Sequence, residues 1–431
     1  MSEKSSSTRR DFLKTSAVVA GGAAMASSLM SNVHADGPEV IRIGLIGCGG
    51  RGSGAVAQCL RGGPNVRLTA LGDAFRDRLE GCLNGLQRDN NLRQNVDVPA
   101  ARQFVGLNAY EGVIQNCDLV LLATPPGFRP IHIRAAINAR KHLFTEKPVA
   151  VDGPGIRTVL DAFQDANRHR LSVVAGTQRR YQTGYIESMR RIHAGEIGTI
   201  TSARCYWNQG GLWHRNRDRG MSDVEWQIRN WLYFTWLSGD HICEQHVHNL
   251  DVVNWALGNS HPVRAVGMGG RQVRTGPEFG HIYDHFAVDY EYPNGVHVMS
   301  MCRQMNGCEN NVSETITGTT GIWHSNYTIM GYPERAGGPL VRRWGFGRGD
   351  NDPYQQEHVA LINSIRNNRP INDLKNVAES TLTAIMGRMA AYTGRAITWD
   401  QALRSEENLM PARLTMNMEL AVPRVAMPGG A

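Results

Sequence analysis

Lysine is scarce in this sequence of 431 residues. Lysine and arginine together number 46, but only five are lysine, which leaves 41 arginines. The lysines are Lys4, Lys14, Lys141, Lys147 and Lys375. Arginine stays protonated in a protein, whereas a partly desolvated lysine can lose its proton near neutral pH. Lys147 follows an apolar segment and is thus a candidate for proton transfer, although a surface lysine of no special role explains the composition equally well.

Features typical of several other protein classes are also missing. The eight cysteines include no C-x-x-C pair and no spacing typical of small secreted scaffolds, so we expect buried thiols without structural disulfides. The net charge is +7, but the arginines are spread along the chain, so nucleic acid is not an expected partner. No segment offers the roughly 20 strongly apolar residues that cross a bilayer, so we expect no membrane partner for the mature chain.

The first 35 residues have the pattern of an export signal. The segment from Thr8 to Lys14 (TRRDFLK) is a twin-arginine motif, followed by a weakly apolar run and the small-residue exit Val33-His34-Ala35. We expect cleavage after Ala35 and a periplasmic location, with an uncleaved, membrane-tethered form as the alternative. This route carries proteins that are already folded, so a cofactor can be loaded before export. The remaining residues are enough for two domains.

A glycine-rich turn follows the first predicted strand, residues 40–46. Its sequence is Gly47-Cys48-Gly49-Gly50-Arg51-Gly52, a G-x-G-x-x-G pattern, and residues 53–60 then predict a helix. Such glycines let the backbone approach a pyrophosphate, and the helix N-terminus offers free N–H groups. The pattern therefore indicates a dinucleotide site.

An acidic residue ends the second predicted strand, residues 66–71. Asp73 lies 26 residues past Gly47, near the usual interval for an acid that binds the adenosine ribose. Because a carboxylate repels a 2′-phosphate, we expect NAD(H) ahead of NADP(H). Arg76 and Arg78 are the argument for the phosphorylated form.

Later segments continue the alternation of strands and helices. Strands are predicted at 117–123, 142–145 and 171–176, and helices at 132–140 and 153–170. The strand at 142–145 carries Glu146-Lys147-Pro148 at its carboxyl end, where open parallel sheets bind ligands. We therefore predict an α/β domain with a doubly wound parallel sheet over residues 36–176, with Lys147 on the cofactor side.

Beyond residue 176 the pattern changes to mostly strands. We expect strands at 200–207, 263–273, 285–292, 295–303 and 312–318, and helices at 184–193, 358–367 and 376–395. Pro293-Asn294-Gly295 is typical of a hairpin. The prediction is a second, α+β domain over residues 177–431, with an open, mostly antiparallel sheet and C-terminal helices.

Two segments of this half carry candidate chemistry. If a helix begins near Glu244, then Glu244 and His248 share one face. Five of the nine tryptophans, at 207, 213, 226, 231 and 236, lie close to several arginines, and aromatic faces beside such donors suit sugars and polyols. Trp213-His214-Arg215 is the preferred substrate segment, whereas Trp226, Trp231 and Trp236 are equally explained as core or subunit interface.

A metal site and a structural histidine are the alternatives for the segment around Glu244. A site built from His241, Cys243, Glu244, His246 and His248 is possible on residue type. Helical register would scatter these groups over several faces, so we expect no metal.

The motifs together resemble the Gfo/Idh/MocA (glucose-fructose oxidoreductase/inositol dehydrogenase) family. The resemblance is carried by the glycine-rich turn, the Thr124-Pro125-Pro126 turn with His132, Glu146-Lys147-Pro148, the segment from Gly176 to Tyr181 (GTQRRY), and the segment from His248 to Asp251 (HNLD). It implies a Rossmann domain followed by an open-sheet domain, and a homo-oligomer. It also implies an NAD(P)-dependent oxidoreductase acting on a sugar or polyol with a tightly bound nicotinamide.

The same resemblance implies roles for individual residues. The lysine of the family motif lies beside the nicotinamide and the substrate hydroxyl, which makes Lys147 and His248 catalytic, with Glu244 orienting His248. Relatives usually carry Asp-x-x-x-His, and the departure to Glu244 weakens its assignment as a proton relay. The implied cofactor-binding residues are Gly47, Cys48, Gly49, Gly50, Arg51, Gly52, Asp73, Thr124, Pro125, Pro126, His132, Glu146, Lys147 and Gln178. The implied substrate residues are Tyr181, Trp213, His214, Arg215 and His248.

Three functions remain open from the sequence. Free dinucleotide is not expected outside the cytoplasm, so an exported enzyme must keep its cofactor and restore its redox state in each cycle. Coupled oxidation and reduction of two sugars meets this condition. Transient oxidation that permits elimination and re-reduction, as in NAD-dependent glycoside hydrolases of this fold, also meets it. A non-catalytic sugar or dinucleotide sensor is the third hypothesis, and an intact Lys147 and His248 argue against it.

Overall fold

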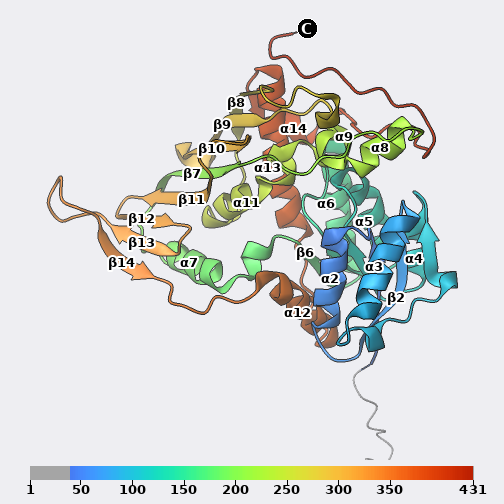
Figure 1. Ribbon diagram of the computed structural model, residues 1–431. Helices are drawn as coiled ribbons and strands as arrows, with labels where there is room; N and C mark the ends of the chain where they lie inside the picture. Colours follow the sequence, from blue (N-terminus) through green and yellow to red (C-terminus); the bar gives the residue numbers. More distant parts are fainter. Residues whose placement is uncertain (1–38, 431) are drawn as a thin grey trace, which may run out of the picture. The chain divides into compact units, whose positions relative to one another are not determined.

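The first part of the chain forms a parallel sheet of six strands (Figure 1). The computed structural model describes residues 39–430, so the twin-arginine segment and the expected cleavage site at Ala35 lie outside the described residues. The strands are β1 (Ile41–Ile46), β2 (Val66–Asp73), β3 (Gln103–Val105), β4 (Leu119–Leu122), β5 (His142–Thr145) and β6 (Val173–Ala175). Their order is β3-β2-β1-β4-β5-β6, and every neighbouring pair is parallel. The predicted parallel sheet is confirmed.

Helices cover both faces of this sheet. The strands are nearly continuous apolar runs, as in β4, which is buried along its whole length, and such strands need cover on both sides. One face packs against α4 (Ala109–Gln115), α5 (Arg129–Asn138) and α6 (Gly153–Arg168). The other face packs against α2 (Gly50–Leu60), α3 (Arg76–Arg88) and α12 (Pro353–Arg366). The arrangement is doubly wound, and α12 joins it from late in the chain.

The strand order reverses at β1, which lies between β2 and β4. At such a point the loops after adjacent strands leave in opposite directions and open a crevice at the carboxyl ends. The glycine-rich turn follows β1 and Thr124-Pro125 follows β4. These two loops therefore face each other across the crevice in which ligands of open parallel sheets bind.

A second sheet of nine strands follows. Its order is β14-β13-β12-β11-β7-β10-β9-β8-β15, and its neighbouring pairs are antiparallel except for the parallel pair β7/β10. The strands are β7 (Ile200–Gln209), β8 (Arg264–Gly270), β9 (His285–Glu291), β10 (His297–Gln304), β11 (Asn311–Gly318), β12 (Gly321–His324), β13 (Thr328–Gly331), β14 (Val341–Gly345) and β15 (Ile397–Thr398). The predicted open, mostly antiparallel sheet is confirmed, and β12 to β14 were not predicted.

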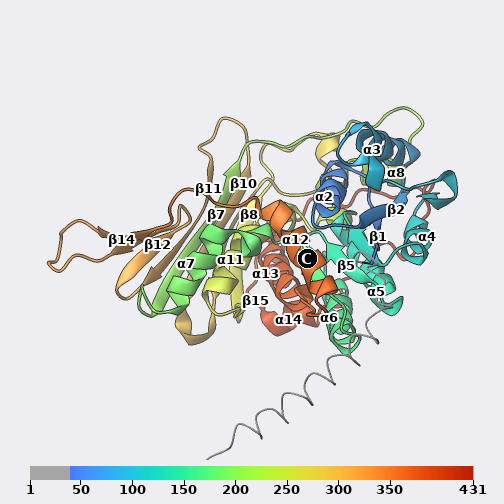
Figure 2. The same cartoon turned by 90° about the horizontal axis from the view of Figure 1, so that it is seen from below.

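Three helices pack on one face of this second sheet, as Figure 2 shows. They are α7 (Thr183–His193), α11 (Val247–Ala256) and α13 (Leu374–Thr393), and the short α14 (Trp399–Leu403) follows at the edge. Buried and exposed residues alternate along β10, which leaves the opposite face of the sheet open to solvent. None of the helices within residues 39–430 is long and apolar enough to cross a membrane.

A late segment of the chain also bonds to the first sheet. Residues 371–373 hydrogen-bond to Val173 of β6, so the late chain extends the edge of the first sheet. Ile41–Ala431 is one compact unit. The division into domains at 36–176 and 177–431 remains a prediction.

The helix expected to begin near Glu244 is two helices. The first, α10 (His241–Glu244), ends at Glu244, and α11 begins at Val247. His246 lies at the break, where its Nε2 is 2.7 Å from the Ser300 hydroxyl of β10. The predicted single helical face carrying Glu244 and His248 is therefore wrong, because the helix is interrupted between Glu244 and Val247.

A third group of buried residues lies between the sheets. It is formed by the segment from α8 (Asp223–Arg229) to α9 (Thr235–Ser238), which contributes Trp226, Phe234 and Trp236. Phe75 and Phe128, from loops of the first sheet, pack into the same group, and apolar residues of the C-terminal tail cover its outside. The tail is the extended red segment that passes α9 and α8 in Figure 1.

Candidate active site

The glycine-rich turn forms an open cradle at the start of α2. Gly47 has φ +96°, and a Cβ there would come within 2.7 Å of the backbone of Ala123. A Cβ on Gly52 would lie 1.9 Å from the carbonyl oxygen of Gly47. A Cβ on Gly49 or Gly50 would meet no protein atom within 4 Å. The outer side of the turn is thus free for a ligand, and the helix N-terminus behind it suits a phosphate.

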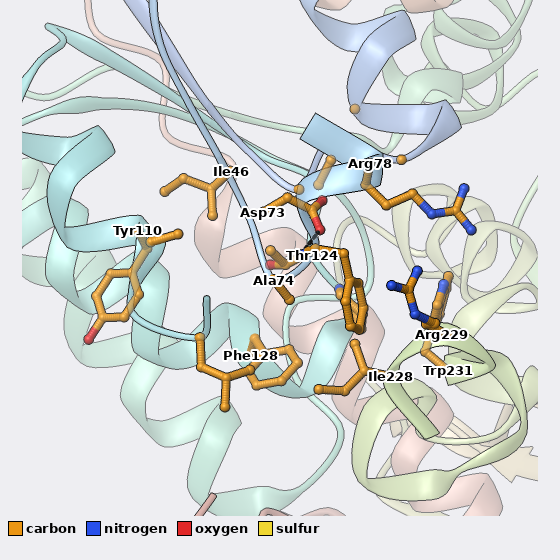
Figure 3. A pocket seen from close by; sticks show the side chains of 18 of the residues that line it. Ile46, Asp73, Ala74, Arg78, Tyr110, Thr124, Phe128, Ile228, Arg229 and Trp231 are labelled. Carbon is orange, nitrogen blue, oxygen red and sulfur yellow. Dashed lines mark hydrogen bonds between the residues drawn. The ribbon is translucent and has the colours of Figure 1, made fainter. Parts of the chain in front are cut away.

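A cavity of about 470 Å³ extends from this cradle across the carboxyl ends of the strands (Figure 3). Its walls come from the loops after β1, β2, β3 and β4 and from the segment between β7 and α9. Residues from these loops, the strand ends before them and the helices after them include Gly49, Asp73, Phe75, Arg78, Leu107, Tyr110, Thr124, Pro125 and His132, and the later segment contributes Trp213, Ile228, Arg229 and Trp231. The loops, size and shape of the cavity fit a dinucleotide.

Asp73 is fixed at the wall of this cavity. Its carboxylate accepts hydrogen bonds from the backbone N–H of Cys48 at 2.6 Å and of Phe75 at 2.8 Å. Burial raises the pKa of this carboxyl. A carboxylate has about four lone-pair sites, so these two bonds leave capacity for a ribose hydroxyl.

His132 also lines the cavity and faces Thr124. Its Nδ1 is 3.2 Å from the Thr124 hydroxyl, and its ring is flanked by Tyr110 and Phe128. Burial lowers the pKa of His132 to about 3, so the imidazole is neutral at physiological pH. Pro126 is buried beside this pair in a short 3₁₀ turn and gives the loop its rigid shape.

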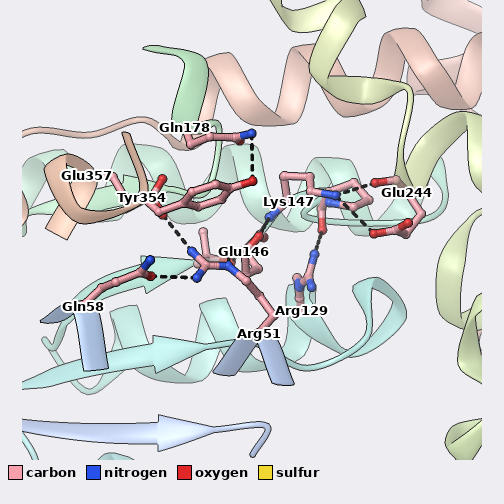
Figure 4. A network of polar contacts seen from close by, with 11 residues as sticks. Arg51, Gln58, Arg129, Glu146, Lys147, Gln178, Glu244, Tyr354 and Glu357 are labelled. Carbon is pink, nitrogen blue, oxygen red and sulfur yellow. Dashed lines mark hydrogen bonds and ion pairs between the residues drawn. The ribbon is translucent and has the colours of Figure 1, made fainter. Parts of the chain in front are cut away.

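Lys147 and Glu244 form an ion pair close to this crevice (Figure 4). The Lys147 ammonium donates to the backbone carbonyl of Glu244 at 2.6 Å and to its Oε1 at 3.1 Å. The two side chains are only 11% and 10% exposed. The end of β5 and the end of α10 therefore place a lysine and a carboxylate within direct proton-transfer distance, although 97 residues separate them.

His248 occupies the first turn of α11 and stacks on Trp207 of β7, with ring centres 5.7 Å apart. Burial lowers the pKa of His248 well below its ordinary value, and the positive charges of Lys147, Arg179 and Arg51 lower it further. The ring is therefore neutral at physiological pH. Trp207 was part of the predicted aromatic group but not of the predicted site.

Arg51 and Glu146 belong to a buried polar network with α12 (Figure 4). The Arg51 guanidinium binds Glu146, and it donates to Oε1 of Glu357 at 2.8 Å. The ring of Tyr354 lies 5.0 Å from the guanidinium carbon, and Gln178 donates to the Tyr354 hydroxyl at 3.3 Å. Arg51, Glu146 and Gln178, all predicted to bind the cofactor, thus join the glycine-rich turn to β5 and α12.

Two further charged groups around this network were not predicted from the sequence. Glu357 is fully buried, and burial raises its pKa well above the ordinary value. Arg129, at the start of α5, is buried and donates to the carbonyl of Pro148, while its Nε has no partner within residues 39–430. Burial lowers the pKa of Arg129 to about 10. Helical carboxylates and arginines are common on protein surfaces, so the sequence offered no signal for either.

The structure does not gather the predicted substrate residues around Lys147. The Tyr181 hydroxyl donates to Asp373 at 2.6 Å and its ring packs on the first sheet, and a substrate role for this residue stays a prediction. Trp213 lines the cavity. His214 contacts the Phe279 ring, and Arg215 pairs with Asp218 at 3.1 Å. Within residues 39–430, no hydrogen bond, ion pair or ring contact joins these four to Lys147 or His248.

The neighbouring histidines and cysteine face in different directions. His241 pairs with Asp240 at 2.9 Å, His246 contacts Ser300, and Cys243 is packed in the core. The backbone of α10 and α11 thus scatters these groups, as the sequence argument expected.

Two models of one protein family match this sequence. "Oxidoreductase family, NAD-binding Rossmann fold" matches residues 41–174, and "GFO/IDH/MocA C-terminal domain" matches residues 185–324. The chain belongs to the Gfo/Idh/MocA family. A third match, to the twin-arginine translocation pathway signal sequence, covers residues 6–26. This Gfo/Idh/MocA protein is thus exported by the twin-arginine route.

The curated relatives are similar over part of their length. Inositol 2-dehydrogenase of Klebsiella pneumoniae (strain 342) is 26% identical over 223 residues, which are 51% of this chain and 56% of the relative. The 2,7-anhydro-N-acetylneuraminate hydratase of Escherichia coli (strain K12) is 24% identical over 258 residues, 59% of this chain and 60% of the relative. The chain therefore spans little more than half the length of these relatives.

A solved structure shares the fold over most of the chain. It is the scyllo-inositol dehydrogenase of Lactobacillus casei with bound NAD(H) and scyllo-inositol, with a TM-score of 0.62 and 18% identity. The match covers 84% of this chain and 99% of that one. At this identity the similarity concerns the fold.

Proposed function

We propose that this Gfo/Idh/MocA protein is an exported, NAD-linked oxidoreductase of sugars or polyols that keeps its cofactor through each catalytic cycle. The observation that carries the proposal is the Lys147–Glu244 ion pair beside His248, close to the loops that form a dinucleotide-sized cavity. The names of the inositol dehydrogenases among its relatives support a polyol or sugar as substrate.

The cradle of the glycine-rich turn, Asp73 and the Thr124–His132 pair are the residues that would hold the dinucleotide. A bound nicotinamide would supply the hydride acceptor for a carbinol carbon. Asp73 favours NAD(H), because its carboxylate opposes a 2′-phosphate. Arg78 and Arg229 also line the cavity, so the nucleotide extracted from the protein decides between the two forms.

Lys147, Glu244 and His248 would manage the proton. The Lys147 ammonium would first give a proton to the Glu244 carboxylate, to which it is hydrogen-bonded, and its neutral amine would then accept the proton of the substrate hydroxyl as the hydride leaves. His248, which burial keeps neutral, would hydrogen-bond the substrate hydroxyl and share its proton. Arg129 adds a fixed positive charge beside the site, which favours a developing alkoxide.

A second candidate is redox-neutral chemistry at the same site. Transient oxidation of a ring hydroxyl acidifies the neighbouring C–H, which permits elimination or hydration before the carbonyl is reduced again. Two observations favour it: the E. coli relative is named as a hydratase, and the twin-arginine signal exports the protein to a compartment without a supply of dinucleotide.

The test begins with protein purified from the exported fraction. The bound nucleotide is released and identified, and the absorbance of the nicotinamide is followed while sugars, polyols and aryl glycosides are added. A lasting change in absorbance with one sugar, reversed by a second, supports net redox chemistry. Product formation without lasting change supports the redox-neutral alternative. Protein that neither contains nor takes up a nicotinamide nucleotide contradicts both.

A further inference from the structure

We infer that the adenosine end of the cofactor site is closed by a cover from the second half of the chain, and that this cover keeps the dinucleotide bound. The cover is residues 210–234, which run from the end of β7 through α8 to the start of α9. The inference rests on the proposed function, since it assigns a second set of binding residues to the same cofactor.

The cover forms one wall of the cavity. Ile228, Arg229 and Trp231 lie opposite the loop after β2, as Figure 3 shows, and Trp213 lines the cavity with them. In sheets of this kind the adenosine lies at the carboxyl end of β2, next to the terminal acid, which is Asp73 here. Trp213 contacts Trp231 edge to face, with ring centres 6.5 Å apart. Aromatic rings and a guanidinium are the surfaces on which a purine stacks.

A latch joins the cover to the first sheet. Two nitrogens of the Arg229 guanidinium donate to the two oxygens of Asp77 on α3, each at 3.0 Å. Its Nε donates to Glu225 at 3.0 Å, and its plane lies 3.7 Å from the centre of the Phe75 ring. Bidentate pairs of this kind are stronger and more directional than single hydrogen bonds. The dinucleotide therefore cannot leave past the cover without breaking a contact between the two halves of the chain.

The C-terminal tail holds the cover from outside. The hydroxyl of Ser222 donates to the carbonyl of Met416, and Gln227 donates to the carbonyl of Leu420 at 2.6 Å. The backbone N–H of Leu420 donates to Asp223 at 2.9 Å. Apolar tail side chains pack on the buried aromatic residues of the cover; these include Met410, Met416, Met418 and Leu420. With its outer side held by the tail and its inner side by the latch, the cover is a fixed wall.

Asp77→Asn tests the latch with little risk to folding, because this carboxylate is 58% exposed. Its matched control is Asp97→Asn, in which an equally exposed carboxylate, at 59%, loses its ion pair with Arg102 away from the cavity. Trp213→Ala, at a ring that is 52% exposed, tests the stacking surface separately. Thermal unfolding of each apo protein reports whether the fold is intact.

The readout is the exchange of bound cofactor. Purified protein loaded with labelled NAD⁺ is chased with unlabelled NAD⁺, and its affinity for ADP-ribose and for nicotinamide mononucleotide is measured. We expect slow release from the wild type and from Asp97→Asn, and release about tenfold faster from Asp77→Asn and Trp213→Ala. Affinity for ADP-ribose falls in the same variants, whereas affinity for nicotinamide mononucleotide does not.

Rapid release from the wild type would overturn the inference, as would a latch variant that releases NAD⁺ as slowly as the wild type. Those results leave the proposed function standing if sugars still change the redox state of added nicotinamide. Conversely, slow release without any response to sugars would contradict the proposed function and leave the cover in place.

Discussion

At the scale of single residues, the chemistry depends on which groups the folded chain leaves neutral and which it pairs. Lys147 is paired with Glu244, and His248 is kept neutral by burial and by neighbouring positive charges. The scarcity of lysine had pointed to Lys147 before any contact was known. The contact with Glu244 adds a physical partner for proton transfer, which composition could not supply.

Replacing Lys147 tests its role as a base. We expect Lys147→Ala to bind NAD⁺ but to lose about 10²–10⁴-fold in turnover, since a positioned proton-transfer group contributes that much. Lys147→Arg should be nearly as impaired, because guanidinium keeps the charge but does not give up its proton. The measurement is kcat with the best substrate, alongside NAD⁺ affinity.

His248→Ala provides the companion measurement for the same prediction. Groups on one proton path are not additive, so the Lys147→Ala/His248→Ala double variant should be little slower than the poorer single variant. Near-normal turnover by Lys147→Arg would show that Lys147 acts through its positive charge and not as a base.

A buried histidine of α12 gives a prediction about pH. Both ring nitrogens of His358 lack partners within residues 39–430, and burial lowers its pKa to about 3. Below about pH 6.5 the unfolded chain binds a proton at this histidine and the folded chain does not, so stability is lost as the pH falls. We expect the unfolding free energy of the wild type, relative to His358→Leu, to fall by about 1.4 kcal/mol per pH unit between pH 6.5 and 4.

Denaturant unfolding at pH 7, 6 and 5 measures this difference. At pH 7 His358→Leu should be at least as stable as the wild type, because it removes two unpartnered buried nitrogens. His297→Leu, at an exposed histidine of β10, is the control. If the unfolding free energy of the wild type and of His358→Leu changes equally with pH, His358 can be protonated in the folded chain and the prediction is contradicted.

At the scale of elements, two glycines of the glycine-rich turn have different roles, one in ligand binding and the other in folding. A Cβ at Gly50 meets nothing, whereas a Cβ at Gly52 meets the carbonyl of Gly47 at 1.9 Å. The absence of a side chain at Gly50 leaves room for a ligand, and its absence at Gly52 leaves room for the backbone of the same turn.

The pair of variants Gly50→Ala and Gly52→Ala makes this separation measurable. Gly50→Ala should leave thermal unfolding of the apo protein unchanged or slightly improved, since alanine favours a helix, and should weaken NAD⁺ binding about 10–100-fold by crowding the pyrophosphate. Gly52→Ala should destabilise the fold itself by about 1–3 kcal/mol. Unweakened NAD⁺ binding by Gly50→Ala would show that the cradle does not contact the cofactor.

The elements also show where sequence reasoning succeeds. Five of the six strands of the first sheet were predicted because both of their faces are buried, so each is a short apolar run, as in β4. The sixth, β3, was missed because it has three residues and is partly exposed. Strands β12 to β14 were missed because they have only four or five residues, contain glycine, and show little alternation of apolar and polar residues in their sequences. The break between α10 and α11 has no proline or glycine to mark it, and His246 at the break contacts Ser300, which lies 54 residues away in the sequence.

In the candidate site, too, residues placed by local sequence are easier to predict than residues placed by distant contacts. Residues whose position depends on one strand and the turn after it, such as Gly47, Asp73 and Thr124, lie on the cavity as expected. Residues on long connections depend on distant contacts. Trp213 lines the cavity, and Arg229 of the same cover binds Asp77, a partner 152 residues away that no local pattern reveals.

At the scale of the whole molecule, export and cofactor retention form one argument. The twin-arginine signal brings a folded protein across the membrane, and the cavity lies between parts of the chain far apart in sequence. A cofactor enclosed there before export would travel with the protein. Replacement of the cofactor outside the cytoplasm would then be unnecessary.

Replacing Arg9 and Arg10 by lysine tests the export step. The twin-arginine pathway recognises the paired guanidinium groups, which lysine does not reproduce. We expect the double variant to accumulate inside the cell, folded and with its nucleotide bound, while the wild type is found in the exported fraction. Fractionation followed by nucleotide extraction measures both. Unchanged export of the double variant would remove the basis for the retention argument.

The central claim is hydride transfer from a sugar or polyol carbon to a retained nicotinamide. The most direct measurement follows the hydrogen itself. The exported protein is given a substrate deuterated at its carbinol carbons, and the reaction is quenched during turnover. The cofactor is then extracted and its mass is measured by mass spectrometry. The account predicts deuterium in the reduced nicotinamide of the wild type and none with Lys147→Ala. Consumption of the substrate by the wild type with no deuterium in the cofactor would contradict it.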